Sequence, residues 1–213
     1  MHRTMTIVAR FIALVALALA SAAPAAPGGL VRVRLETSAG PIVVAVDTKR
    51  APITAGNFLR YVDEKRLDNT TFYRAARNRS NPKTGLVQGG NNHAVRRSLA
   101  PIAHEPTSRT GLLHVDGTLS MARNAPGTAM GDFFITVGPA KYLDARPGYP
   151  GYAAFGHVVS GKNVIARILA LPTFPGGYSL ETLGQSIRQP VRIVTLAKTP
   201  RGKREPGEHA ERP

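Results

Sequence analysis

The sequence predicts an all-β domain with two helices, folded as a closed eight-stranded antiparallel β-barrel. Many short apolar or β-branched runs alternate with glycine, proline and asparagine, which is typical of strands joined by turns. Only two segments, 52–64 and 162–171, carry apolar residues at helical spacing. Closure of a barrel removes the unpaired sheet edges that so many short strands would otherwise leave.

The expected elements follow one another without an internal repeat. Pro52 suits the first turn of a helix, where its missing N–H is harmless. Segment 75–85 is polar, basic and rich in turn formers, so we expect an exposed loop there, and segment 101–116 is expected to form another loop. Strands are predicted at residues 32–36, 42–46, 70–74, 86–88, 119–122, 133–137, 153–155 and 191–197.

The chain is expected to divide into a leader, a linker, one domain and a tail. Residues 1–23 have a basic start, a run of ten apolar residues at 11–20 and small residues at the end, which is the layout of a signal peptide. We expect cleavage near Ala22 or Ala23, a flexible linker at 24–29, the domain at 30–198 and a disordered basic tail at 199–213. The alternative is an uncleaved anchor, but a membrane span needs about 20 residues.

Composition excludes some sites and leaves others open. Lysine and arginine total 28 against 13 acidic residues, a formal charge of +15, which is compatible with nucleic acid, anionic membrane or acidic protein partners. The basic residues are scattered and lack interleaved aromatic stacking platforms, so we expect a solvated basic surface and no nucleic-acid partner. With no cysteine, the chain has neither disulfides nor a thiolate zinc site.

A stretch at 119–137 is the centre of the functional interpretation. Two β-rich runs flank a loop of turn formers, and the second run contains Phe133 and Phe134. Adjacent strand residues point to opposite faces, so one phenylalanine is expected to anchor the core while the other lines a cleft. Arg74 and Gln88 lie on two strands upstream. An apolar pocket with a fixed guanidinium and a neutral amide suits a neutral, proline-like ligand that is polarised without bond breaking.

Five motifs occur in an order that resembles the cyclophilin peptidyl-prolyl cis-trans isomerases, with the bacterial exported members most alike. They are FYR at 72–74, LVQGG at 86–90, GTLSMAR through GDFFITVG at 117–138, KYLD at 141–144 and YAAFGHVVSG at 152–161. The resemblance covers about residues 31–198. It implies a barrel capped by a helix at each mouth, no cofactor, and a monomeric periplasmic isomerase or chaperone acting on proline-containing unfolded or extended polypeptides. No stable membrane insertion is expected after the leader is cut.

The resemblance also implies how catalysis would work. An X–Pro bond rotates slowly because twisting it sacrifices amide resonance, at a barrier of about 20 kcal/mol. Catalysis therefore requires that the twisted form be bound better than either planar isomer. Arg74 is expected to donate to the prolyl nitrogen, whose lone pair localises on twisting, and Gln88 to orient the guanidinium or bind the substrate backbone.

The remaining site residues are carried over from the same motifs. Leu86, Phe134 and Leu143 are expected to form the proline pocket, with Phe133 packed behind it. Tyr152 takes a slot where many members have histidine. Substrate binding is also expected at the backbone of Ala122 and Arg123, and at Asp132, whose charge would favour basic substrates.

Several positions depart from the family pattern. Tyr73 replaces a histidine common in eukaryotic members, Leu86 replaces methionine, and Gly85 stands where an aromatic residue usually closes the pocket. There is no tryptophan, and Tyr142 takes the position associated with cyclosporin contact, so weak inhibition by that drug is expected. These departures keep open a cyclophilin-shaped peptide-binding module or holdase with little isomerase activity. A basic protein that binds anionic envelope polymers is a third possibility.

The sequence gives no sign of hydrolytic or metal chemistry. No serine, histidine and acid constellation stands out. His93, His104, His114 and His157, together with Glu105, lack a helical metal-binding spacing, so structural or surface roles are expected for them.

Overall fold

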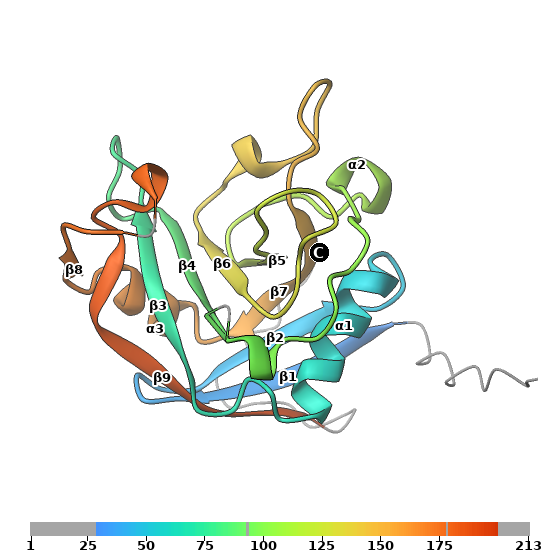
Figure 1. Cartoon of the computed structure of the whole chain (residues 1–213), viewed down its shortest axis with the longest axis horizontal. Coiled ribbons are helices and arrows are strands. Elements are labelled where there is room, and N and C mark those ends of the chain that lie inside the picture. The colour runs from blue at the N-terminus through green and yellow to red at the C-terminus, as the bar shows by residue number, and fades with distance from the viewer. Residues whose placement is uncertain (1–28, 93, 178, 200–213) are drawn as a thin grey trace, which may run out of the picture.

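The computed structural model describes residues 29–92, 94–177 and 179–199, which form one antiparallel sheet rolled into a barrel (Figure 1). The strand order is β1-β2-β7-β5-β6-β4-β3-β9, and pairing of β1 with β9 closes the ring. This confirms the predicted eight-stranded closed barrel. The strands are β1 (Leu30–Thr37), β2 (Ile42–Asp47), β3 (Thr70–Arg77), β4 (Gly85–Gly90), β5 (Thr118–Met121), β6 (Phe133–Val137), β7 (Ala153–Ser160) and β9 (Ser186–Lys198).

Two helices pack on the barrel as predicted. α1 (Pro52–Asp63) begins at the proline and buries Phe58 and Val62, and α3 (Lys162–Leu169) buries Val164, Ile165, Ile168 and Leu169. All of these side chains belong to the main core, so the helices cover the barrel interior and exclude water from it. No helix in the described ranges is long and apolar enough to cross a membrane.

The loops between the main elements contain short helical turns and a short strand that the sequence did not reveal. A helical turn, α2 (Thr107–Thr110), lies inside the segment expected to be a loop. The two-residue strand β8 (Thr173–Phe174) pairs with β9 outside the closed ring. Three single 3₁₀ turns are η1 (Val95–Arg97), η2 (Lys141–Leu143) and η3 (Leu180–Thr182).

Some predicted boundaries were wrong. β3 continues to Arg77 and pairs with β4 from Gly85 onward, so the loop between them spans only 78–84 rather than 75–85. The polar appearance of this stretch was misleading because Ala75 supplies the single inward side chain there and is buried. β7 extends past 155 to Ser160, and β9 begins at 186 rather than 191. The expected leader, most of the linker and residues 200–213 of the tail lie outside the described residues.

The barrel core is built around four phenylalanines. Phe133 contacts Phe58 edge-on at 5.5 Å between ring centroids and Phe72 at 5.8 Å, and Phe58 lies 5.3 Å from Phe155. Phe134, the next residue along β6, belongs instead to a separate apolar cluster with Leu86, Ala140 and Leu143. The adjacent phenylalanines therefore point to opposite faces, as predicted. This alternation places an apolar surface on the outside of the barrel wall.

Candidate active site

A β-bulge brings the polar residues of the site together. Along β3, Phe72 pairs with Gly89 and Arg74 pairs with Gln88, so Tyr73 is an extra residue without a partner on β4. An extra residue lets two consecutive side chains point to the same face, and bulges are common next to active sites for this reason. Phe72 and Ala75 face the core and are buried, whereas Tyr73 and Arg74 both line the outer pocket.

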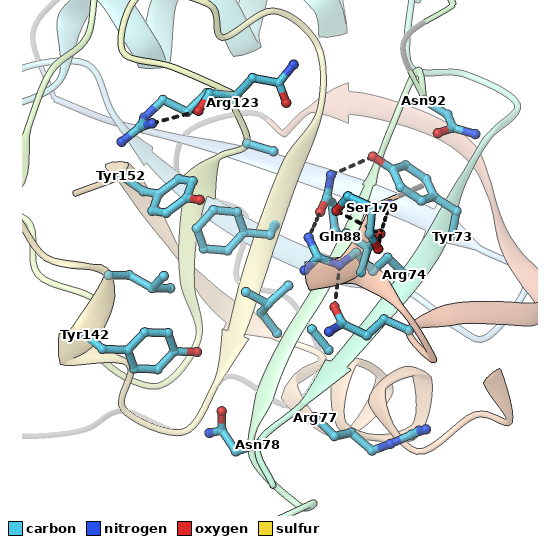
Figure 2. Close-up of a pocket in the computed structure, with 18 residues that line it drawn as sticks. Tyr73, Arg74, Arg77, Asn78, Gln88, Asn92, Arg123, Tyr142, Tyr152 and Ser179 are labelled. Carbon is cyan, nitrogen blue, oxygen red and sulfur yellow. Dashed lines mark hydrogen bonds between the residues drawn. The ribbon is translucent and has the colours of Figure 1, made fainter. Parts of the chain in front are cut away.

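Two glutamine side chains hold the Arg74 guanidinium (Figure 2). Its Nη1 donates to Gln88 Oε1 at 2.7 Å, and its Nε donates to Gln185 Oε1 at 2.8 Å. Gln185 is itself fixed, because its Nε2 donates to the Glu181 carbonyl at 2.8 Å and its own carbonyl accepts from the Ala75 N–H at 2.8 Å. The plane of the guanidinium is thus set by both neighbouring amides.

The hydrogen bonds of Tyr73 define the orientation of the Gln88 amide. Gln88 Nε2 donates to the Tyr73 hydroxyl at 2.7 Å, and Tyr73 has a further hydrogen bond with the Asp132 side chain. An ionised carboxylate only accepts, so the phenol must donate to Asp132 and accept from Gln88. The amide oxygen of Gln88 must then face Arg74. Burial and the Asp132 charge both raise the pKa of Tyr73, which keeps the phenol protonated.

The guanidinium keeps its charge and part of its donor capacity. Burial lowers the pKa of Arg74 below its ordinary value, but an arginine remains protonated at any working pH. The guanidinium has five N–H groups, and two of them, the N–H of Nε and one N–H of Nη1, donate hydrogen bonds to the glutamines. Nη2 makes no hydrogen bond to another described residue, so it is available to a ligand in the pocket.

An apolar socket adjoins the guanidinium. We use this name for Leu86, Phe134 and Leu143 with the partly buried Ala122 and Tyr152, all of which line one pocket of about 610 Å³ that also contains Arg74. The Tyr152 ring meets Phe134 edge-on at 5.5 Å and fixes one wall. Figure 2 shows Tyr142 and Tyr152 on one side of the pocket and Arg74, Gln88 and Tyr73 on the other. A small apolar ring would therefore rest beside a fixed cation.

A buried polar relay supports the socket from behind. His114 stacks on Phe134 with ring centroids 6.0 Å apart. Its Nδ1 lies 2.6 Å from Asp144 Oδ1, and its Nε2 lies 2.9 Å from Ser120 Oγ. Burial lowers the pKa of His114 although Asp144 opposes this effect, so the ring is neutral. Nδ1–H then donates to the carboxylate and Nε2 accepts from the serine.

This relay is a serine, histidine and acid constellation that the sequence did not reveal. It does not form a hydrolytic site, because Ser120 is fully buried and none of the three side chains lines the pocket. The described residues also contain no group of three or more potential metal ligands.

The structure brings most of the expected site residues into one pocket. Its lining includes Arg74, Gln88, Leu86, Ala122, Arg123, Phe134, Leu143 and Tyr152. Phe133 lies behind the socket in the core, as expected from its alternation with Phe134.

The placement of Asp132 corrects one expectation. Asp132 is buried outside the pocket lining, and its Oδ1 accepts from the Asn92 N–H at 2.8 Å. The carboxylate anchors Tyr73 and the chain after β4 and does not line the pocket. The expected preference for basic substrates loses its basis.

Gly85 has a structural role that the sequence did not suggest. It is the first residue of β4, pairs with Arg77 of β3 and has a φ of +147°. A Cβ built on it would lie 2.0 Å from the Ala76 carbonyl oxygen. A side chain at this position would meet the neighbouring strand rather than close the pocket.

Sequence reasoning missed Gln185 as part of the site. It lies 111 residues from Arg74 in the chain and directly precedes β9. The segment around it also supplies Ser179 and Thr182 to the pocket lining. Its amino-acid sequence shows neither the alternation of a strand nor the apolar spacing of a helix. The sequence does show that Gln185 is a polar residue close to the last strand, but it does not indicate which side chain Gln185 contacts.

Comparison with known proteins identifies the family. The model of the cyclophilin-type peptidyl-prolyl cis-trans isomerases matches residues 32–197. The chain belongs to this family. It is 34% identical over 169 residues to a peptidyl-prolyl cis-trans isomerase of Acinetobacter baylyi, covering 77% of this chain and 83% of the relative. It is 33% identical over 153 residues to peptidyl-prolyl cis-trans isomerase B of Escherichia coli, covering 68% and 88%.

Solved structures agree with the fold. A cyclophilin-type isomerase of Cryptosporidium parvum superposes with a TM-score of 0.60 at 18% identity, covering 81% of this chain and 99% of that structure. The same kind of protein was also solved in the presence of the dipeptide Ala-Pro, and it superposes with a TM-score of 0.59 at 19% identity, with 79% and 99% covered. At these identities the likeness supports the cyclophilin barrel.

Proposed function

We propose that this member of the peptidyl-prolyl isomerase family accelerates X–Pro rotation by electrostatic stabilisation of the twisted imide. The observation that carries the proposal is the Arg74 guanidinium, fixed by Gln88 and Gln185 beside the apolar socket. Because the guanidinium is already held in place, it does not have to reorient when the transition state forms. No free energy is then lost in ordering the side chain, and the hydrogen bond stabilises the transition state in full.

The chemistry of rotation matches what the site offers. In both planar isomers the prolyl nitrogen lone pair is delocalised into the carbonyl, and at the half-rotated stage it is localised on nitrogen. A nearby N–H donor stabilises that stage more than either planar form, which lowers the barrier. The unused donors of Arg74 supply this interaction, while Leu86, Phe134 and Leu143 hold the proline ring. No bond is broken, so neither a nucleophile nor a proton acceptor is required.

The substrates in this proposal are proline-containing, unfolded or extended polypeptides. The pocket of about 610 Å³ combines the apolar socket with Ala122 and Arg123 in its lining. An extended segment would pair with the backbone of Arg123, because the Ala122 N–H already donates to the Asp132 carbonyl at 3.0 Å. The leader pattern at residues 1–23 supports export, and we place the protein in the periplasm, assisting the folding of exported proteins. Cell fractionation with N-terminal sequencing of the exported protein tests this placement, and an intact leader on a cytoplasmic protein would contradict it.

An isomerase assay on the purified protein tests the mechanism. Arg74→Ala should lower kcat/KM by about 100-fold or more, the usual effect of removing a fixed transition-state donor. Arg60→Ala is the matched control, because Arg60 is an exposed arginine of α1 that pairs with Glu64 and lies outside the pocket. Equal activity in the wild type and Arg74→Ala would remove Arg74 from the mechanism. Negligible isomerisation together with aggregation suppression that survives Arg74→Ala would instead favour a holdase.

A further inference from the structure

The pocket lining is strongly cationic. Three arginines line it, Arg74, Arg77 and Arg123, and the lining contains no aspartate or glutamate. Arg77 is directed toward the C-terminal end of α3, where its Nη1 donates to the carbonyls of Leu169 and Leu171 at 2.8 and 2.9 Å and the negative end of the helix dipole offsets part of its charge. Arg74 and Arg123 form no ion pair with a described carboxylate. An extended peptide in this pocket would therefore lie in a positive field.

Nearby carboxylates do not outweigh this charge. Asp132 is buried behind the pocket, where it is hydrogen-bonded to Tyr73 and the Asn92 N–H, and it is one carboxylate against three lining arginines. Glu181 lies on the same segment as Ser179 and Thr182, but its carboxylate is fully exposed to solvent, bonds to Ser179 and is not part of the lining. Water screens a charge so placed far more than it screens one within the pocket.

Arg123 is the cation best placed to contact a substrate side chain near the proline. It follows Ala122 of the socket, and its guanidinium lies over the Tyr152 ring at 4.7 Å from the centroid. Its partners are the backbone carbonyls of Asn124 and Gly151, which orient the group without neutralising it. Its Nε is buried without a hydrogen-bond partner. Figure 2 shows it beside Tyr152, on the side of the pocket away from Arg77.

We propose that the site prefers peptides with an aspartate or glutamate within two residues of the proline, and that Arg123 determines this preference. The inference rests on the proposed isomerase function and names its substrate class. It reverses the preference for basic substrates expected from Asp132, because the structure removes that carboxylate from the pocket and leaves arginines in its wall. The excess of basic over acidic residues, 28 against 13 in the full sequence, persists after removal of a leader that contains Arg3 and Arg10, and it adds long-range attraction for acidic chains.

Peptides that differ at one position test the preference. Three otherwise identical oligopeptides carry glutamate, glutamine or lysine two residues before the proline, and the set is repeated with the substitution directly before and directly after the proline. Exchange NMR measures catalysed cis-trans rates without a coupling protease that has its own specificity. At low ionic strength, and for at least one of the three peptide positions, kcat/KM should be about threefold to fivefold higher for the glutamate peptide than for the glutamine peptide, which is the effect of a solvent-accessible ion pair. The lysine peptide should have the lowest kcat/KM.

Variants separate Arg123 from the general field of the protein. Arg123→Gln should bring the glutamate-to-glutamine ratio close to one, and the ratio compares two substrates on the same variant, so it does not depend on how active that variant is. Lys49→Gln removes the same charge from an exposed turn outside the pocket and should keep the ratio. A wild-type ratio of one at all three positions, or a ratio that survives Arg123→Gln, would overturn the inference while leaving the isomerase function intact. Catalysis of no peptide at all would overturn both.

Discussion

At the scale of single residues, the site depends on one continuous chain of side-chain hydrogen bonds. Asp132 accepts from Tyr73, Tyr73 accepts from Gln88, and Gln88 accepts from Arg74. Each link determines which group of the next residue donates and which accepts, so a buried carboxylate outside the pocket lining determines how the Arg74 guanidinium is held. Such networks are worth more than isolated bonds because every member restricts the orientation of its neighbours.

The second support of the guanidinium, Gln185, gives a prediction at this scale. Gln185→Leu removes the acceptor of Arg74 Nε and leaves the guanidinium held from one side only. We expect kcat to fall about tenfold with little change in KM, because misplacing a reacting group slows chemistry more than it weakens ground-state binding. Gln189→Leu, at an exposed position of β9, is the matched control and should behave as the wild type. A rise in KM of about tenfold with unchanged kcat would instead show that Gln185 only binds substrate.

At the scale of elements, the site is a property of the strand pairing between β3, β4 and β9. The bulge at Tyr73 turns two consecutive side chains outward, and the start of β9 brings Gln185 against Arg74. The wall on the other side comes from β6 and η2, through Phe134 and Leu143. The positions of the apolar residues along each strand therefore decide where the socket forms, whereas the bulge decides that a guanidinium lies beside it.

Gly85 gives a prediction for this strand pairing. Gly85→Ala should destabilise the fold by about 3 kcal/mol or more, since its Cβ would lie 2.0 Å from the Ala76 carbonyl oxygen on β3. Gly111→Ala is the matched control, because Gly111 also has a positive φ of +70° but no heavy atom within 4 Å of the added Cβ. That variant should lose only about 1 kcal/mol from backbone strain. Urea unfolding of both variants measures the difference, and equal losses would contradict a clash between strands.

The sequence predicted those parts of this arrangement that follow from local pattern. Alternation identified Phe134 as facing away from Phe133, and the apolar spacing identified both helices. The pairing of Arg74 with Gln88 was accessible only through the resemblance, because nothing local shows which strands are neighbours. Gln185 was missed because its contact spans 111 residues, and the burial of Asp132 was missed because a carboxylate near the site looks the same in sequence whether it faces solvent or a phenol.

At the scale of the whole molecule, stability is coupled to pH through the relay behind the socket. Burial lowers the pKa of His114 in the folded protein below its ordinary value of 6.5. Between 6.5 and that lowered pKa, the unfolded chain binds a proton that the folded chain does not, so stability falls as the pH falls. The lowered pKa values of Asp47 and Asp116 start from 3.8, so these carboxylates titrate below this window. Burial also lowers the pKa of His157, which adds to the fall but contributes equally to the wild type and to a variant at position 114.

Replacing His114 with asparagine tests this coupling. His114→Asn should destabilise the protein at pH 7.5, because the asparagine side chain is too short to keep both the Asp144 and Ser120 contacts and leaves space beneath Phe134. The difference in unfolding free energy between wild type and variant should narrow as the pH falls from 6.5 to 5, since only the wild type loses the contribution of a neutral buried imidazole. That contribution amounts to about 1.4 kcal/mol for each tenfold difference in proton affinity between the folded and unfolded states. Urea unfolding at several pH values measures the gap. A gap that stays constant would show that His114 is protonated equally in both states, and a gap that widens toward acid would mean that Asp144 raises its pKa more than burial lowers it.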